Sequence, residues 1–139
     1  MMIDLKSLNI GDKLTLLQYR VRRADLIKYA GASLDFNPIH YSDRIATSVG
    51  LPGVIAHGMH TMGAVARVIT DHLPANSFVS SYSTKFTNPV VVPDDEVGAL
   101  VSVAATVTAK EADSIFFNIE TTCGGEKVLN QTKLTVSFK

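Results

Sequence analysis

The feature that most limits the fold is one long segment in which apolar and other residues alternate. From Val97 to Ala109 every odd position is apolar: Val97, Ala99, Val101, Val103, Ala105, Val107 and Ala109. Successive side chains of a strand point to opposite faces, so a period of two predicts a long strand with one apolar face. That face has to be covered by another part of the chain.

The segment from Gly58 to about His72 predicts the cover. Its apolar residues spread around most of a helical circumference: Met59, Met62, Val65, Ala66, Val68 and Ile69. A helix that is apolar nearly all round is normally buried, so we expect the sheet to wrap around it. The small residues Gly63, Ala64 and Ala66 predict close packing against the backbone of this helix.

Weaker patterns predict the other elements. We expect a first strand at 13–22, a helix at 24–30 that ends at Gly31, a short helix at 41–48 closed by Gly50, a strand at 77–86, and two final strands joined by a turn at Gly124 and Gly125. In the final strands Ile115, Phe117 and Ile119, then Val128, Leu134, Val136 and Phe138, should face one side.

These elements predict a single α+β domain over residues 1–139, with an antiparallel sheet folded around one long helix. A helix lying across a flatter sheet is the alternative. Long strands with exposed edges favour pairing with a second chain, so we expect a dimer.

Composition narrows the class of protein. Hydrophobic residues make up 46% of the chain, and 13 basic residues balance 13 acidic ones, which argues against disorder and against a nucleic-acid partner. No apolar stretch reaches the roughly 20 residues of a membrane span, so we expect a soluble, cytoplasmic protein with no membrane partner. The single Cys123 is interpreted as a small strand residue.

The stretch Leu34-Asp35-Phe36-Asn37-Pro38-Ile39-His40 is the main candidate site. On a helix Asp35 and His40 would point about 140° apart, but Pro38 and the turn-forming Asn37 disfavour a helix. A turn can place both side chains around one water for proton transfer. The alternative is that Asp35 caps a turn or the following helix and that His40 is a packed imidazole.

A second element favours the functional interpretation. The segment Ala56-His57-Gly58-Met59 places Gly58 at the start of the apolar helix, where backbone N–H groups and the helix dipole can stabilise an oxyanion. A carboxylate, an imidazole and an oxyanion site suit addition or loss of water next to a thioester carbonyl. We find no nucleophile motif and no convincing metal-ligand spacing, so we expect no metal.

The two motifs, Tyr29 to His40 and Ile55 to Met59, resemble the signature of the MaoC-like (R)-specific enoyl hydratases and dehydratases. Within that family the greatest likeness is to the catalytic subunit of mycobacterial-type (3R)-hydroxyacyl-ACP dehydratases. The resemblance implies a dimeric hotdog fold, a catalytic dyad of Asp35 and His40, support of the turn by Asn37, and a backbone N–H of Gly58 that donates to the thioester carbonyl.

The same resemblance implies the substrate and partners. We expect interconversion of trans-2-enoyl and (3R)-hydroxyacyl thioesters, carried on CoA or on acyl carrier protein, with no separate cofactor. The chain is expected to form a homodimer, or a heterodimer with a related hotdog subunit. Two alternatives are a non-catalytic subunit of a heterodimeric dehydratase and a hotdog acyl-CoA thioesterase.

Two positions depart from the family pattern. Leu34 stands where the family usually has Gly, so we expect a slightly different local path or a Leu34 side chain in the acyl channel. His60 stands where an apolar residue is more usual, and both His60 and His72 are interpreted as partly exposed or hydrogen-bonded side chains.

Three further features carry weaker expectations. His57 is interpreted as a supporting residue that fixes the loop before the helix through a ring hydrogen bond. The cluster of Arg20, Arg22 and Arg23 is either a solvated face or a contact for a CoA phosphate or an acidic carrier protein. The segment 87–93 is interpreted as a connecting loop at the mouth of the substrate tunnel.

Overall fold

The structure is a computed structural model that describes residues 2–14 and 16–139. It contains β1 (Leu17–Val21), α1 (Arg23–Ser33), a single 3-10 turn (Pro38–His40), α2 (Asp43–Ser48), α3 (Gly58–Thr70), β2 (Ser77–Phe86), β3 (Ala99–Lys110), β4 (Ser114–Cys123) and β5 (Glu126–Phe138). The predicted α+β class is confirmed. The predicted strand at 13–22 includes Thr15, which lies outside the described residues, and the observed strand begins only at Leu17.

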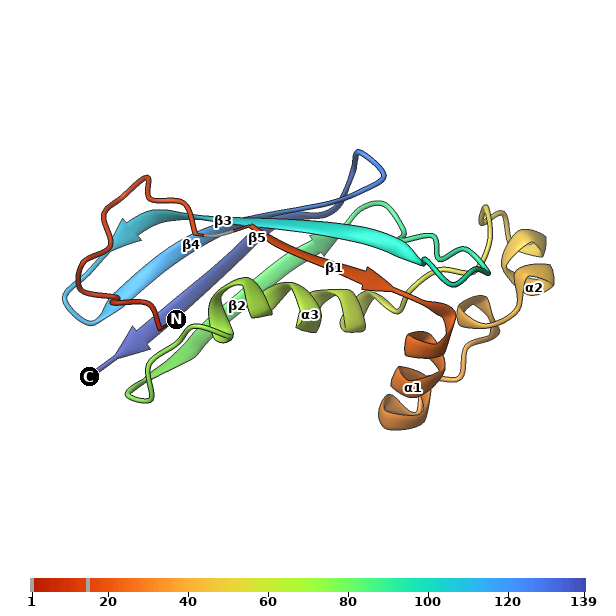
Figure 1. Cartoon of the computed structure of the whole chain (residues 1–139), viewed down its shortest axis with the longest axis horizontal. Coiled ribbons are helices and arrows are strands. Elements are labelled where there is room, and N and C mark those ends of the chain that lie inside the picture. Colours follow the sequence, from red (N-terminus) through yellow and green to blue (C-terminus); the bar gives the residue numbers. More distant parts are fainter. Residues whose placement is uncertain (1, 15) are drawn as a thin grey trace.

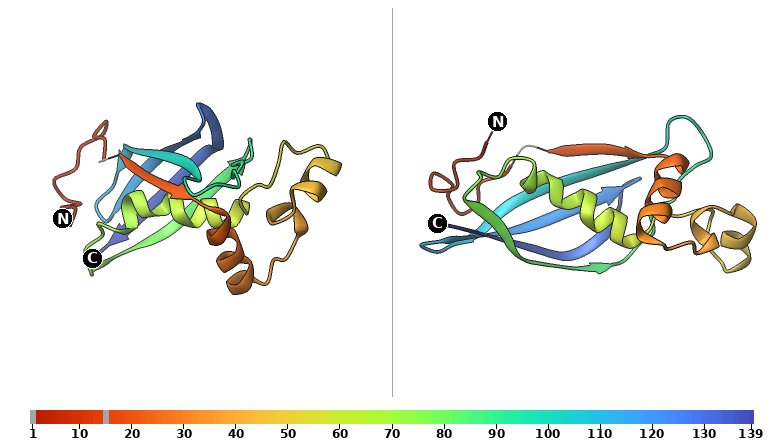
Figure 2. Two further views of the ribbon diagram at one scale, coloured as in Figure 1. Left: turned by 45° about the vertical axis from the view of Figure 1, so that its right-hand side comes forward. Right: turned by 90° about the horizontal axis from the view of Figure 1, so that it is seen from below.

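One antiparallel sheet carries α3 on one of its faces (Figures 1 and 2). The strand order is β1-β3-β4-β5-β2, so β2 pairs with β5 and forms one edge, while β1 forms the other. This is the hotdog arrangement of a long helix against a curved sheet. The helices α1 and α2 lie together at one end of the molecule, away from both termini (Figure 1).

The alternation in the strands is largely confirmed. On β3 the side chains of Ala99, Val101, Val103, Ala105 and Val107 are buried, as are Ile115, Phe117 and Ile119 on β4. The prediction that Val97 belongs to this strand is wrong, because Val97 precedes β3 and is 54% exposed. The last strand buries both Val128 and Leu129, because the pairing between β4 and β5 shifts register and Gln131 adopts a positive φ of 49°.

Helix α3 is buried along one side only. Thr61, Val65, Val68 and Ile69 face the sheet, whereas Met59 is 60% exposed. A Cβ built on Gly63 would meet no atom within 4 Å, so the predicted close packing at Gly63 is wrong within this chain. The sheet covers α3 from one side (Figure 2, right), which leaves the opposite side of an apolar helix open.

The two short helices differ from their predicted bounds. Helix α1 continues through Gly31 to Ser33 and ends at Leu34, which adopts left-handed angles of φ 62° and ψ 19°. Helix α2 begins at Asp43 rather than Tyr41, because the Ser42 side chain accepts the N–H of Ile45 and caps the helix there. Its end is followed by Gly50 at φ 88°, as a helix-terminating glycine should be.

Within the described part of the chain no helix combines the length and apolar character needed to cross a bilayer.

Candidate active site

The turn between α1 and α2 is built by local hydrogen bonds. The Oδ1 atom of Asn37 accepts the N–H of Ile39 at 3.2 Å, and the Asn37 carbonyl accepts the N–H of His40 at 3.1 Å. The N–H of Asn37 donates to Oδ1 of Asp35 at 3.2 Å. Asn37 therefore lies at the centre of the turn. One of the two carboxylate oxygens of Asp35 caps the turn.

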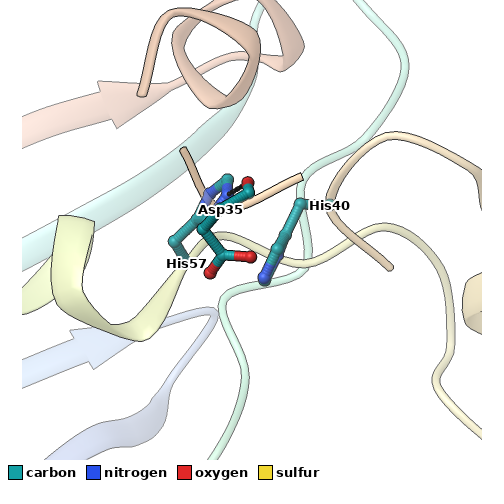
Figure 3. Close-up of side chains that lie close together, drawn as sticks. All are labelled: Asp35, His40 and His57. Atoms are coloured by element: carbon teal, nitrogen blue, oxygen red, sulfur yellow. Dashed lines mark hydrogen bonds between the residues drawn. The ribbon is translucent and has the colours of Figure 1, made fainter. Parts of the chain in front are cut away.

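His40 ends this turn and is buried, with 8% of its surface exposed. Its Nδ1 atom lies 2.7 Å from the carbonyl oxygen of Ile55, which only accepts hydrogen bonds, so Nδ1 carries the proton in the neutral ring. The Nε2 atom is then an acceptor. Figure 3 shows the carboxylate of Asp35 beside the ring of His40, as the proton-transfer interpretation requires.

The environment of His40 favours its neutral form. Burial lowers the pKa of His40 below its ordinary value of 6.5, and nearby His57 lowers it further. The hydrogen bond to Ile55 and the charge of Asp35 act in the opposite direction but do not reverse the shift. At neutral pH the ring is therefore available as a proton acceptor.

His57 connects the two motifs. It is only 2% exposed, and its Nε2–H donates to the backbone carbonyl of Asp35 at 3.1 Å. Its ring stacks on His40 with centroids 3.7 Å apart, and the Tyr29 ring packs against it at a tilt of 59°, with centroids 4.8 Å apart. The ring hydrogen bond follows the interpretation from sequence, but the stack on His40 has no signal in the spacing of the two residues.

Helix α3 begins at Gly58, next to the turn. The first helical hydrogen bond runs from the N–H of Thr61 to the carbonyl of His57 at 3.1 Å, so the N–H groups before it have no partner inside the helix. This end of the helix also carries the positive end of the dipole. Gly58 thus lies where the sequence predicts an oxyanion site.

A pocket of about 290 Å³ starts at this point. It is lined by His40, Leu51, Ile55, Ala56, Gly58, Thr61, Phe86, Thr87, Asn88, Pro89, Val90, Val128 and Leu129. The structure therefore brings His40 and Gly58 to one apolar pocket, with the exposed Asp35 beside His40.

The loop at 87–93 has a larger part in the site than its sequence indicates. Four of its residues, Thr87 to Val90, line the pocket. The loop also pairs with the segment before α3, because Ala56 N–H donates to Val90 at 2.9 Å and Val92 N–H donates to Val54 at 2.9 Å. The pairing fixes Ile55, whose carbonyl orients His40.

Leu34 lies away from the pocket. Its side chain is 76% exposed and is not among the pocket-lining residues, so the expectation that it enters the acyl channel finds no support in this chain. The backbone instead keeps the left-handed angles that a glycine would adopt without strain. The turn after Leu34 therefore follows a glycine-like path despite the leucine.

The three arginines of the predicted basic cluster differ in their contacts. Arg23 donates through Nε to the carbonyl of Val92 at 2.6 Å and through a terminal nitrogen to Asp43 at 2.9 Å and 3.0 Å. Its guanidinium is committed to holding α1, α2 and the 87–93 loop together. Arg20 and Arg22 are exposed, so a contact with a phosphate would have to depend on these two residues.

His60 is half-buried on α3, with its ring edge-on to Tyr29 at 5.3 Å. Burial lowers its pKa. Its Nδ1 atom is buried without a hydrogen-bond partner among the described residues. The residue as a whole is partly exposed, which is one of the two alternatives expected from the sequence.

Asp35, His40 and His57 also form a possible metal-binding group, since one ligand atom of each lies within 4.8 Å of the others. The rings of His40 and His57 are nearly parallel, at 23°, and in-plane lone pairs of parallel rings do not converge on one ion. One nitrogen of each ring also faces a backbone carbonyl, at Ile55 and Asp35. The arrangement fits proton transfer better than metal binding.

Comparison with known proteins gives named relatives. The chain is 33% identical over 102 residues to the mitochondrial 3-hydroxyacyl-[acyl-carrier-protein] dehydratase of Arabidopsis thaliana, covering 73% of this chain and 60% of that protein. It is 31% identical over 104 residues to the (R)-specific enoyl-CoA hydratase of Rhodospirillum rubrum, covering 74% and 69%. It is 39% identical over 74 residues to 3-hydroxyacyl-thioester dehydratase X of Mycobacterium tuberculosis, covering 53% and 25%.

Solved structures share the fold. A MaoC-like dehydratase superposes with a TM-score of 0.89 at 30% identity, over 96% of this chain and 42% of that one. A chain of the ChsH1-ChsH2 complex from Mycobacterium tuberculosis superposes with a TM-score of 0.82 at 18% identity, over 94% and 98%. The model of the MaoC like domain matches residues 6–122, which is more than four fifths of the sequence. The chain therefore belongs to the MaoC-like dehydratase family.

Proposed function

We propose that this chain is an (R)-specific hydratase/dehydratase, a hydro-lyase that interconverts trans-2-enoyl and (3R)-3-hydroxyacyl thioesters. The observation that carries the proposal is the Asp35 carboxylate beside a buried His40 whose Nδ1–H is held by Ile55. The relatives named as enoyl-CoA hydratase and hydroxyacyl-ACP dehydratase support this reaction class.

In the hydration direction Asp35 and His40 hold one water over C3 of the enoyl group. Asp35 takes a proton from the water as its oxygen bonds to C3, and the π electrons move to the thioester oxygen. The N–H of Gly58 at the start of α3 stabilises the enolate. A proton then returns to C2 through the dyad, which restores both residues; dehydration runs through the same steps in reverse.

We propose CoA or the phosphopantetheine of an acyl carrier protein as the substrate's carrier. Relatives named for acyl carrier protein and for CoA support both. The proposed chemistry uses only side chains, a backbone N–H and water, so we expect no resident cofactor or metal. Dialysis against a chelator should therefore leave the hydration rate unchanged. We place the reaction in the cytoplasm.

The chain is proposed to act as a dimer, either with itself or with a related hotdog subunit. Two features support a partner beside the pocket: Met59 at the start of α3 is 60% exposed, and β2 is an edge strand whose Phe86 is 53% exposed. The ChsH1-ChsH2 complex is an assembly of two named chains with this fold. A solution mass of twice the 15.0 kDa of one chain is expected for the homodimer.

Incubation of the purified chain with crotonyl-CoA tests the function against its rivals. Loss of enoyl absorbance without release of free thiol, with (3R)-3-hydroxybutyryl-CoA as the product, is the expected result. Thiol release would instead identify a thioesterase. Absence of both reactions in a protein that binds the substrate would identify a non-catalytic subunit.

Variants of the dyad test the assignment of residues. Asp35→Asn and His40→Ala should each lower turnover by roughly 100-fold or more, as expected for loss of general acid–base catalysis. Asp94→Asn changes an exposed aspartate outside the pocket and serves as the control. Full activity in either dyad variant would remove Asp35 or His40 from the mechanism.

A further inference from the structure

Four aromatic rings form a continuous series from the dyad to α3. The first contact is the stack of His40 on His57, with centroids 3.7 Å apart. The Tyr29 ring then lies 4.8 Å from His57 at a tilt of 59°, and His60 lies 5.3 Å from Tyr29 at 76°. Tilted and edge-to-face contacts are favourable arrangements of aromatic rings. Because Tyr29 belongs to α1 and His60 to α3, Tyr29 connects His57 to both helices.

The His57 ring depends on its neighbours for its orientation. Its Nε2–H donates to the carbonyl of Asp35 at 3.1 Å, but its Nδ1 atom is buried without a hydrogen-bond partner in the part of the chain that the structure describes. A buried acceptor without a partner costs stability, so the ring would gain by turning this nitrogen toward water. Rings packed on His57 oppose that rotation, because they occupy the space that it needs.

Tyr29 contacts His57 through its ring and not through its hydroxyl. One face of His57 is filled by the stacked ring of His40, so the tilted ring of Tyr29 lies against another part of the same surface. The buried side chains of Leu26 and Ala30 anchor this side of α1. The Tyr29 hydroxyl makes no hydrogen bond with any residue that the structure describes. Phenylalanine should therefore replace Tyr29, whereas a side chain without a ring should not.

We propose that Tyr29 is a positioning residue, whose ring keeps His57 in the orientation that supports the dyad. The inference rests on the proposed function, because it assigns Tyr29 a part in the same reaction. Tyr29 is not among the residues that line the pocket, so it acts through His57 and not on the substrate. Without the Tyr29 ring, His57 can turn away from the carbonyl of Asp35, and water reaches the stack on His40. His60 supports the Tyr29 ring from α3.

The test compares wild type, Tyr29→Phe, Tyr29→Leu and Lys28→Leu. Tyr29→Leu removes the ring but keeps an apolar, helix-forming side chain, and Lys28→Leu changes the exposed neighbour on the same helix as a control. Tyr29→Met replaces Tyr29→Leu if the latter does not fold. With crotonyl-CoA, Tyr29→Leu should lower kcat by about fivefold with little change in KM, because the dyad is misaligned while the pocket is kept. Wild-type kcat in Tyr29→Leu, or an equal loss in Tyr29→Phe or Lys28→Leu, would overturn the inference.

A double-mutant cycle separates positioning through His57 from a general effect on the fold. His57→Gln removes the ring against which Tyr29 packs. If Tyr29 acts through that ring, adding Tyr29→Leu to His57→Gln should lower kcat by less than about twofold further. The same loss in both backgrounds would show that Tyr29 acts elsewhere and would overturn the inference.

An NMR titration of the four histidines tests the positioning without turnover. Burial is the largest cause of the lowered pKa of His40, and water admitted beside His57 reduces that burial. The pKa of His40 should therefore rise toward its ordinary value of 6.5 in Tyr29→Leu and stay unchanged in Tyr29→Phe. An unchanged pKa of His40 in Tyr29→Leu would overturn the inference. The expected shift in a protein that hydrates no enoyl-CoA would reject the proposed function and keep the structural link from Tyr29 to His40.

Discussion

The imidazole rings of His40 and His57 stack face to face, with centroids 3.7 Å apart and 23° between their planes. The stack joins the two sequence motifs, because His40 ends the turn and His57 precedes α3. Since the Nε2–H of His57 also donates to the carbonyl of Asp35, one buried ring contacts both members of the proposed dyad. His57 is therefore a positioning residue for Asp35 and His40.

Two variants separate the contributions of His57. His57→Phe keeps an aromatic ring against His40 but removes the donor to Asp35, whereas His57→Gln keeps an amide donor and removes the ring. We expect each variant to lower kcat by about tenfold with little change in KM, because the dyad loses one of its two supports while the pocket is kept. Steady-state kinetics on crotonyl-CoA measures both parameters.

The pH profile distinguishes positioning of the dyad from a general effect on folding. His57 is one of the groups that lower the pKa of His40, so both variants should move the acidic limb of kcat/KM to higher pH. His72→Phe makes the same substitution away from the pocket and should leave the limb in place. Loss of activity without movement of the limb would contradict this role of His57.

The wild-type pH profile provides a second prediction. Burial is the largest cause of the lowered pKa of His40, so the neutral ring persists below pH 6.5, the ordinary value. Because activity requires neutral His40, it should be kept as pH falls below 6.5 and be lost only as pH passes through the lowered pKa. An acidic limb of kcat/KM at or above 6.5 would contradict the assignment of His40.

Much of the fold follows from sequence because the relevant signals are periodic. The alternation in β3 and β4 and the apolar face of α3 determine which side chains meet in the core. The pairing of β2 with β5 has no such signal, because it depends on how the long connection at 87–98 crosses the end of the sheet. Long-range contacts of this kind are fixed by packing and not by local pattern.

The candidate site likewise combines a local turn that the sequence predicts with long-range contacts that it does not. The local turn that places Asp35 and His40 is predictable from Asn37 and Pro38, whose chemistry acts within a few residues. The positions of Phe86 over Gly58 and of Ile55 against His40 depend on contacts across 28 and 15 residues, and no spacing rule predicts them. Gly31 was a misleading local signal, since α1 passes through it.

The end of α1 provides a third prediction, on stability. Leu34 is exposed and holds left-handed angles that cost a leucine about 1 kcal/mol more than a glycine, so Leu34→Gly should stabilise the protein by about that amount. Gly31 has helical surroundings and open space at its Cβ, so Gly31→Ala should also stabilise, by about 0.5–1 kcal/mol.

Thermal denaturation measures both changes, and each corresponds to a rise in Tm of about 3 °C. The two variants are controls for each other. One introduces a glycine at position 34, where it is favourable, and the other removes a glycine at position 31, where it is unfavourable. A fall in Tm for Leu34→Gly would mean that the leucine side chain contributes contacts that outweigh its backbone strain.

The Arg23 contacts give the fourth prediction. Arg23→Ala removes a hydrogen bond to the carbonyl of Val92, worth about 1 kcal/mol, and an ion pair with Asp43. Arg22→Ala, which changes an exposed neighbour, is the control and should alter stability little. Urea denaturation at pH 7 should therefore show a lower free energy of unfolding for Arg23→Ala alone.

The difference between wild type and Arg23→Ala should also depend on pH. The N–H of Val54 and, next, the Arg23 side chain lower the pKa of Asp43 below its ordinary value of 3.8. A carboxyl with a lowered pKa stabilises the fold above its ordinary value, and the effect is lost as pH falls through the lowered pKa. Acidification below pH 4 should reduce the difference in unfolding free energy between wild type and Arg23→Ala. The part due to the hydrogen bond between Arg23 and the Val92 carbonyl should remain. A difference that stays constant from pH 7 to pH 3 would show that the ion pair with Asp43 contributes nothing to stability.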